Sequence, residues 1–194
     1  MSDSTRRIPD FPIPEAGRIC RIAHSRGLLR FSEVAEAVRA LPYGRPRNAD
    51  EIGAVFSESK GTCSTKHRFL AELARECGRL DVHLVLGLYA MCEANTPGVG
   101  PVLAEDGFCA IPEAHCYLLC GRQRFDFTGL PAGTVAIFQS ISEERVINPA
   151  EVLHAKPAYH RQALIKWARA HDIDPARAWA IRERCIRALS GDSP

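Results

Sequence analysis

Two short runs of strand-forming residues, 115–120 and 123–128, are separated in the chain only by Gly121 and Arg122. Glycine tolerates the positive φ angle that a tight turn between antiparallel strands requires, so this pattern predicts a β-hairpin. Side chains alternate between the two faces of a strand, and a hairpin therefore fixes which residues of its two strands can meet.

The register of the hairpin decides whether His115 and Asp126 can interact. With a two-residue loop, Cys120 pairs with Gln123, and His115 and Asp126 lie on the same face as diagonal neighbours, roughly 7 Å apart at Cβ. That separation allows an imidazole and a carboxylate to form a hydrogen bond. A three-residue loop would place them on opposite faces, so the register tests this pairing directly.

The segment 61–67, Gly-Thr-Cys-Ser-Thr-Lys-His, precedes a predicted helix and contains a candidate nucleophile, Cys63. The apolar residues that follow recur at the spacing of one helical face, and Gly78 supplies a C-terminal stop. Cys63 is therefore expected at or near a helix start. A thiol attacks as the thiolate, which a helix N-terminus and a nearby imidazolium both favour. We predict Cys63 as nucleophile, His115 as its base and Asp126 as the residue that orients the histidine.

Three segments carry a resemblance to a known enzyme family: Gly-Thr-Cys-Ser-Thr-Lys-His at 61–67, Ala-His-Cys-Tyr-Leu at 114–118 and Arg-Phe-Asp-Phe-Thr-Gly at 124–129. Their order resembles the transglutaminase-like family within the papain-like cysteine enzymes. The resemblance covers roughly residues 57–130. It implies a cysteine heading a helix packed on an antiparallel sheet, with His and Asp on adjacent strands, and hence the same three residues as a catalytic triad.

The predicted chemistry is hydrolysis of an amide, isopeptide or ester, or acyl transfer from one, through a thioacyl intermediate on Cys63. The substrate would be a peptide, a protein or a small amide or ester, and no cofactor or metal is expected. Backbone N–H groups at the helix start can form part of an oxyanion hole. Ser57, Ser59 and Ser64 are further candidates for oxyanion or substrate binding; Ser64 stands where animal transglutaminases commonly carry an aromatic residue.

Three alternatives remain open from the sequence. His67, one helical turn after the nucleophile, could serve as the base. Cys109, His115, Cys116 and Cys120 could form a zinc site in a regulatory protein, although paired C-x-x-C motifs are missing and His115 and Cys116 point to opposite faces of their strand.

The third alternative is a non-catalytic binding module that keeps the fold. Such a module would hold a partner in the cleft or on the C-terminal helices that carry Trp167 and Trp179. Burial of Cys63 would favour this reading.

The expected fold is α+β: an antiparallel sheet with the Cys63 helix packed on it, flanked by N- and C-terminal helices. The length of 194 residues suits a single transglutaminase-like domain, with an arm at about 1–14, the core at about 57–130 and a C-terminal helical segment at about 149–190. Further helices are expected over 14–25 and from Ser32 as cap to Pro42, and strands over 81–91 and 134–138. Loop 95–101 is a candidate wall of the cleft. Asn148-Pro149 and Asp174-Pro175 place capping residues before a proline, and we predict helices over about 158–171 and 175–189.

Composition limits the partners and the compartment. The chain is 46% hydrophobic and 25% charged, as in ordinary globular proteins, and its net charge of +2 is spread along its length. Neither nucleic acid nor a membrane is therefore expected as a partner. No apolar run resembles a signal sequence or a membrane span, so we expect a cytoplasmic protein whose eight cysteines are mostly reduced. The sequence does not indicate an oligomeric state.

Overall fold

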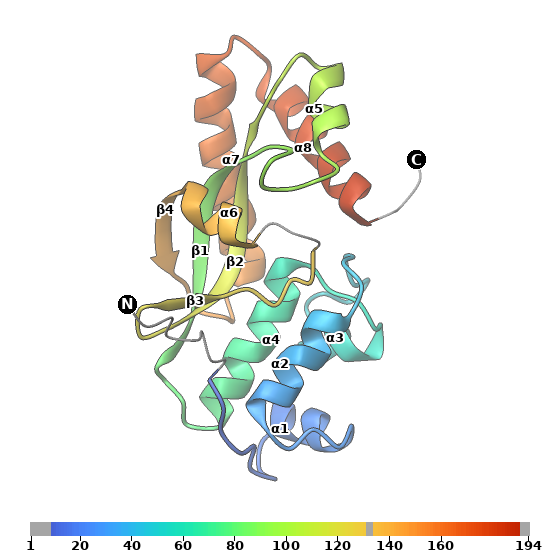
Figure 1. Ribbon diagram of the computed structural model, residues 1–194, viewed down its shortest axis with the longest axis vertical. Helices are drawn as coiled ribbons and strands as arrows, with labels where there is room; N and C mark the ends of the chain where they lie inside the picture. Colours follow the sequence, from blue (N-terminus) through green and yellow to red (C-terminus); the bar gives the residue numbers. More distant parts are fainter. Residues whose placement is uncertain (1–8, 131–133, 191–194) are drawn as a thin grey trace, which may run out of the picture. The chain divides into compact units, whose positions relative to one another are not determined.

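The computed structural model describes residues 9–130 and 134–190 (Figure 1). These residues form eight helices and a four-stranded antiparallel sheet in the order β3-β2-β1-β4, which confirms the predicted α+β class. They divide into two compact units: the first takes 9–85, 116–129 and 146–150, and the second takes 86–115, 130, 134–145 and 151–190. Strands β1 and β2 supply residues to both units. The single-domain organisation stays a prediction.

The first unit is built around helix α4. Its helices are α1 (Arg18–His24), α2 (Phe31–Ala40), α3 (Ala54–Ser57) and α4 (Cys63–Glu76), and the first three all contact α4. It also contains β3 (Gln123–Phe125) and parts of β1 (Val82–Met91) and β2 (Ile111–Cys120). Apolar side chains on one face of α4 are buried, as the helical spacing predicts, and Phe69 packs edge-on against Phe56 with ring centroids 5.2 Å apart.

Helix α2 begins before the predicted cap, Ser32. The Ser32 hydroxyl instead donates to Asp10, at 2.7 Å. The carboxylate of Glu33 accepts the backbone N–H groups of Leu29 and Arg30 at 2.8 and 3.1 Å, and it thus satisfies donors at the start of the helix. Glu33, the third residue of the helix, therefore provides the capping that we predicted for Ser32.

The β2–β3 hairpin has the predicted register. Cys120 pairs with Gln123 and Leu118 with Phe125, and Gly121 adopts a positive φ of 59° in the two-residue loop. The second strand is shorter than expected, because β3 ends at Phe125 rather than near residue 128. Asp126 therefore lies just beyond the last paired residue, and its same-face relation to His115 stays a prediction.

Two thiols meet at the far end of α4. The sulfur atoms of Cys20 and Cys77 lie 3.9 Å apart. Beside them, Glu76 accepts the backbone N–H groups of Ile19 and Cys20 at 2.8 and 2.9 Å, at the start of α1. Burial, followed by the neighbouring Cys77, raises the pKa of Cys20 to about 12. The eight cysteines are all free thiols.

The second unit gathers most of the C-terminal half of the chain. Its helices are α5 (Gly100–Glu105), α6 (Thr134–Ser140), α7 (Val152–Ala170) and α8 (Pro175–Ser190), and α8 contacts both α5 and α7 (Figure 1). Their core includes Tyr89, Met91, Ile111, Leu164 and Ile181. Within the described ranges, none of the helices combines the length and the apolar character needed to cross a membrane.

The predicted strand over 134–138 is wrong. This run lies in α6, and the fourth strand, β4 (Ile141–Val146), follows it. A short apolar run fits a helix or a strand equally well by periodicity. The sequence did not predict β4, because this strand lies at the edge of the sheet and carries three consecutive charged residues, Glu143 to Arg145. Charged edge strands are common because they discourage pairing with other chains.

The two predicted proline-led helix starts have different outcomes. Helix α8 begins at Pro175, and Asp174 accepts the N–H of Arg177 at 3.2 Å, as predicted. Asn148 accepts the N–H of Ala150 at 3.1 Å, but this caps a turn, because α7 begins at Val152. Helix α7 thus starts later than Pro149 but earlier than the predicted bound of about 158, and it runs through Pro157.

A buried ion pair joins β2 to α8 in the second unit. The guanidinium of Arg182 donates to both carboxylate oxygens of Glu113, at 2.6 and 2.9 Å. Burial alone would raise the pKa of Glu113, but the charges of Arg182 and His160 outweigh burial and lower it to about 2. His160 donates its Nε2 proton to the Pro112 carbonyl at 2.8 Å. The pair links a strand and a helix that are far apart in sequence.

Candidate active site

Cys63 is the first residue of α4, as predicted. The start of the helix is fixed by a reciprocal pair: Thr65 Oγ1 accepts the N–H of Thr62 at 2.9 Å, and Thr62 Oγ1 accepts the N–H of Thr65 at 3.5 Å. This is a capping box in which threonine takes the place of the usual glutamate. It places Cys63 at the positive end of the helix dipole.

The backbone before Cys63 is held by a neighbouring loop. Gly61 donates its N–H to the Pro42 carbonyl at 3.1 Å, and its own carbonyl accepts the N–H of Gly44 at 3.3 Å. Glycine is required at position 61, since a Cβ there would lie 2.7 Å from Cγ of Lys66. The lysine side chain thus passes directly over the backbone that leads to Cys63.

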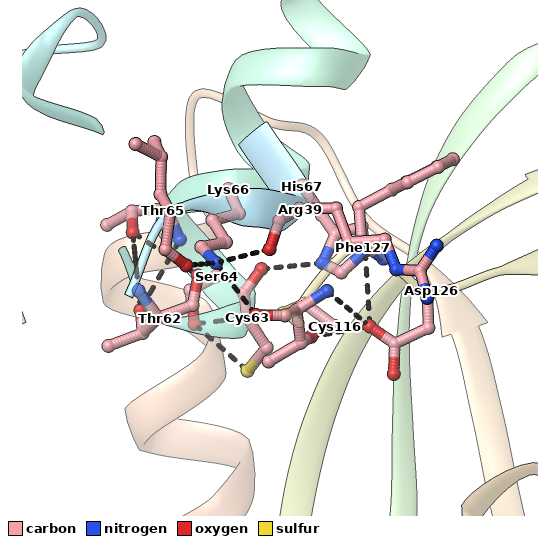
Figure 2. Close-up of polar contacts among 12 residues, drawn as sticks. Arg39, Thr62, Cys63, Ser64, Thr65, Lys66, His67, Cys116, Asp126 and Phe127 are labelled. Carbon is pink, nitrogen blue, oxygen red and sulfur yellow. Dashed lines mark hydrogen bonds and ion pairs between the residues drawn. The ribbon is translucent and has the colours of Figure 1, made fainter. Parts of the chain in front are cut away.

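The side chain of Cys63 is largely buried, with 5% of the residue exposed. Its sulfur lies 4.0 Å from the hydroxyl oxygen of Ser64, which in turn is 3.8 Å from the sulfur of Cys116 on β2 (Figure 2). The Ser64 hydroxyl therefore stands between two thiols. Of the three serine candidates, it is the one in contact with Cys63 among the described residues.

Lys66, one turn into α4, is fully buried and joins three segments. Its ammonium donates to the carbonyls of Leu41 at 2.6 Å, Thr128 at 2.7 Å and Arg39 at 3.5 Å (Figure 2). Arg39 and Leu41 lie at the C-terminal end of α2, where helix carbonyls carry partial negative charge. Thr128 follows β3. Lys66 therefore ties the start of α4 to both α2 and the hairpin.

The charge of Lys66 acts on two of the predicted catalytic residues. Burial lowers the pKa of Lys66 to about 8, and negative charges on Asp126 and Cys63 partly oppose that shift. Electrostatic interaction is reciprocal, so a protonated Lys66 stabilises a carboxylate at Asp126 and a thiolate at Cys63. An ammonium buried beside a cysteine is a recognised environment for a reactive thiol.

His67 is held in one protonation state by two backbone groups. Nδ1 lies 2.8 Å from the carbonyl oxygen of Cys63, which can only accept, so Nδ1 carries a proton. Nε2 lies 2.7 Å from the backbone N–H of Phe127 and therefore accepts. The ring is neutral and completely buried. Its Nε2 lies 3.5 Å from Oδ1 of Asp126, a contact that is an ion pair only when the ring is protonated. Both ring nitrogens are thus engaged by backbone groups, which argues against His67 as the general base of the alternative reading.

Asp126 occupies a turn that α4 holds in place. Its Oδ1 accepts the backbone N–H of Thr128 at 2.8 Å and also the Thr128 hydroxyl. Thr128 is bonded to Lys66, and the intervening Phe127 is bonded to His67 (Figure 2). Two consecutive residues of α4 thus clamp the three residues after β3. The clamp brings Cys63 and Asp126 into one network.

The remaining predicted site residues are His115, Ser57 and Ser59. His115 belongs to the second unit, where it is buried and its ring meets Tyr89 edge-on at 6.3 Å. Ser57 ends α3 and is exposed. Ser59 has a positive φ of 52°, and its hydroxyl lies 3.5 Å from the Phe56 carbonyl. Across the described residues, no hydrogen bond joins Ser57 or Ser59 to Cys63.

No group of three or more His, Cys, Asp or Glu side chains within 9–130 and 134–190 is arranged to hold a metal ion. The thiols of the alternative zinc site have other neighbours: Cys116 contacts Ser64, and Cys120 lies 3.4 Å from Asp81. Sequence reasoning missed the part that Lys66 plays. The sequence offers spacing as its one hint: Lys66 and His67 stand three and four residues after Cys63 and therefore share its face of the helix.

Comparison of the chain with protein-family models, with curated proteins and with solved structures found no match.

Proposed function

We propose that the chain is a cysteine-dependent hydrolase or acyltransferase of transglutaminase-like type, with Cys63 as nucleophile, His115 as base and Asp126 as the residue that orients the histidine. The observation that carries the proposal is the setting of Cys63: a capped helix start with a buried ammonium, Lys66, whose charge interacts with the cysteine. Both features favour a thiolate.

In the proposed reaction, His115 takes the proton of Cys63, and the sulfur attacks the carbonyl carbon of an amide, isopeptide or ester. The backbone N–H of Cys63 donates to the resulting oxyanion, with Ser64 as a second donor. The C–N or C–O bond then breaks, and His115 returns the proton to the leaving amine or alcohol. Water or an amine attacks the thioester and releases Cys63. A peptide, a protein or a small amide or ester is the proposed substrate.

The clamp on Asp126 supports its assignment. Lys66 and His67 hold the backbone on either side of Asp126 through Thr128 and Phe127. A carboxylate that orients a catalytic histidine must itself be rigid, because small displacements in such a group reduce the rate strongly.

Alkylation by iodoacetamide across pH tests the proposal. Peptide mass spectrometry measures the alkylation of each cysteine as the pH is varied. We expect the pH midpoint of the reaction at Cys63 to lie below the ordinary thiol pKa of about 8.5. His115→Ala should raise that midpoint toward the ordinary value, and Lys66→Met should raise it as well. An ordinary midpoint for Cys63 that His115→Ala leaves unchanged would contradict the triad.

Matched controls separate these effects from general perturbation. His83→Ala removes an exposed histidine from β1, and Lys60→Met removes a lysine that has no hydrogen bond or ion pair with Cys63. Neither should move the Cys63 midpoint. Mass spectrometry of acyl adducts trapped from a lysate would identify the acyl group, and Cys63→Ser should abolish the adduct.

A non-catalytic binding module is the second candidate, and one observation favours it. Only 5% of Cys63 is exposed, which is the degree of burial expected for an idle thiol. Absence of any acyl adduct, together with an ordinary alkylation midpoint, would support this candidate over the enzyme.

The proposed activity belongs in a reducing compartment, and the cytoplasm is the proposed location. Thiolate chemistry requires Cys63 in its reduced form. The free state of all eight cysteines agrees with that requirement.

A further inference from the structure

The second unit contains a pocket of about 540 Å³ that the proposed chemistry does not use. Its walls come from β1, the segment that leads into β2, β4 and helix α7, all within that unit. The volume lies in the range of pockets that bind small organic molecules, about 300–1,000 Å³.

The pocket exists because alanines stand where larger side chains would fill it. Ala163 and Ala170 are two helical turns apart on α7 and so share one face of the helix, while Ala90 and Ala110 contribute from β1 and from the residues before β2. Leu88 and Ile111 complete an aliphatic wall.

The aromatic rings at the pocket already have partners within the protein. Trp167 stacks on His171, with ring centroids 4.3 Å apart, and meets Phe108 edge-on at 5.2 Å. The guanidinium of Arg145 covers the ring of Tyr159 at 3.7 Å. Aliphatic surface is therefore the main contact offered to a ligand, which favours a flexible aliphatic body over a flat aromatic one.

The charged groups at the pocket differ in whether they are paired. Glu143 accepts the hydroxyl of Tyr159 at 2.9 Å. Lys166 has no hydrogen bond or ion pair with any part of the chain that the structure describes. Gln162 stands one turn before Lys166 on α7, so its amide lies on the same face and can donate to the same acceptor.

We propose that this pocket binds an aliphatic carboxylic acid, with the hydrocarbon chain against the alanines and the carboxylate on Lys166 and Gln162. The aliphatic walls supply affinity by burying hydrocarbon, and the ammonium and the amide select a single anionic end group. This site is separate from Cys63 and does not depend on the proposed acyl transfer.

Fluorescence of Trp167 provides the test. In a Trp179→Phe background, Trp167 is the remaining indole, since the chain has two tryptophans. We expect decanoate, kept below its micelle concentration, to change the emission with saturation. Decanol should bind about tenfold more weakly and decylamine more weakly still.

Two kinds of variant distinguish the site from nonspecific hydrophobic binding. Lys166→Met should weaken decanoate about tenfold and leave decanol unchanged, whereas Lys60→Met, the same charge change elsewhere, should alter neither. Ala163→Phe should block both ligands. Ala170→Phe, at the exposed end of α7, serves as a second blocking variant if the first fails to fold.

The proposal is overturned if decanoate gives no saturable change, or if Lys166→Met binds decanoate as the unaltered chain does. Equal affinities for decanoate and decylamine would also overturn it, because the selection for an anion would then be missing.

Discussion

His67 connects helix α4 to the residues after β3 through hydrogen bonds with two backbone groups. We expect His67→Ala to lower the free energy of unfolding by about 3 kcal/mol, because it leaves a cavity and removes the acceptor of the buried Phe127 N–H. Urea denaturation measures this. His83→Ala, at an exposed position of β1, should change the stability by less than about 0.5 kcal/mol. A comparable loss in both variants would contradict the assigned part of His67.

Lys66 makes stability depend on alkaline pH. The native lysine loses its proton near pH 8, whereas the unfolded chain keeps it to about 10.5. Between these values the unfolded state binds more protons, so the contribution of Lys66 to stability rises with pH. Relative to Lys66→Met, the free energy of unfolding should therefore increase from pH 8 to 10.5, by about 3 kcal/mol at most.

Urea denaturation of both proteins across that range measures the difference. Subtracting one free energy of unfolding from the other cancels the titration of the tyrosines and the other lysines, which the two proteins share. A difference that stays flat, or that falls with pH, would contradict a lowered pKa for Lys66.

The sequence could place Cys63 but not the clamp around Asp126. A helix start is a local property, visible in Thr62 and in the apolar spacing that follows. The contacts of Lys66 are with carbonyls 25 and 62 residues away, and any residue type supplies a carbonyl. Composition and spacing do not reveal which backbone carbonyls accept a hydrogen bond, so the sequence could not predict this arrangement.

Among the elements, β2 and α8 depend on the pair of Glu113 and Arg182. Glu113→Gln should lower the free energy of unfolding by about 3 kcal/mol, because buried Arg182 loses the carboxylate that pairs with it through two hydrogen bonds, although Glu183 still pairs with it. Glu105→Gln, which removes an exposed partner of Arg184, should cost less than about 1 kcal/mol. Thermal and urea denaturation of the two variants provide the comparison.

Acid adds a second readout of the same pair. The native pKa of Glu113, about 2, lies below its ordinary 4.5, so the stabilisation is present above pH 4.5 and is lost as pH falls toward 2. The Glu113→Gln variant should lack this component of acid sensitivity. Equal acid sensitivity in the variant and the unaltered chain would show that the pair does not stabilise the native state.

Elements with a local signal were predictable, and those decided by tertiary contacts were not. The hairpin register followed from Gly121, and the start of α8 followed from Asp174 and Pro175. The run 134–138 could have formed either structure, and the charged β4 has no apolar face to reveal it. Asn148 satisfied a capping rule but capped a turn, because such side chains serve both purposes.

For the whole molecule, the shared strands predict how the two units unfold. Since β1 and β2 supply residues to both, loss of either strand removes part of each unit, and we expect one cooperative transition. Both tryptophans lie in the second unit, so their fluorescence reports on it, while far-UV circular dichroism reports on both units. The urea midpoints measured by fluorescence and by circular dichroism should coincide. They should also coincide in the His67→Ala variant, although that substitution lies in the first unit. Separate midpoints would contradict the expectation.

The thiols at the far end of α4 bear on how the chain behaves toward electrophiles. Burial raises the pKa not only of Cys20 but also of Cys77, Cys120 and Cys185. Half of the cysteines are thereby made poor nucleophiles at neutral pH, although every one is reduced. A covalent probe added to the native protein therefore meets fewer competing thiols, and the exposed Cys109 is the main one against which an activated sulfur would have to be distinguished.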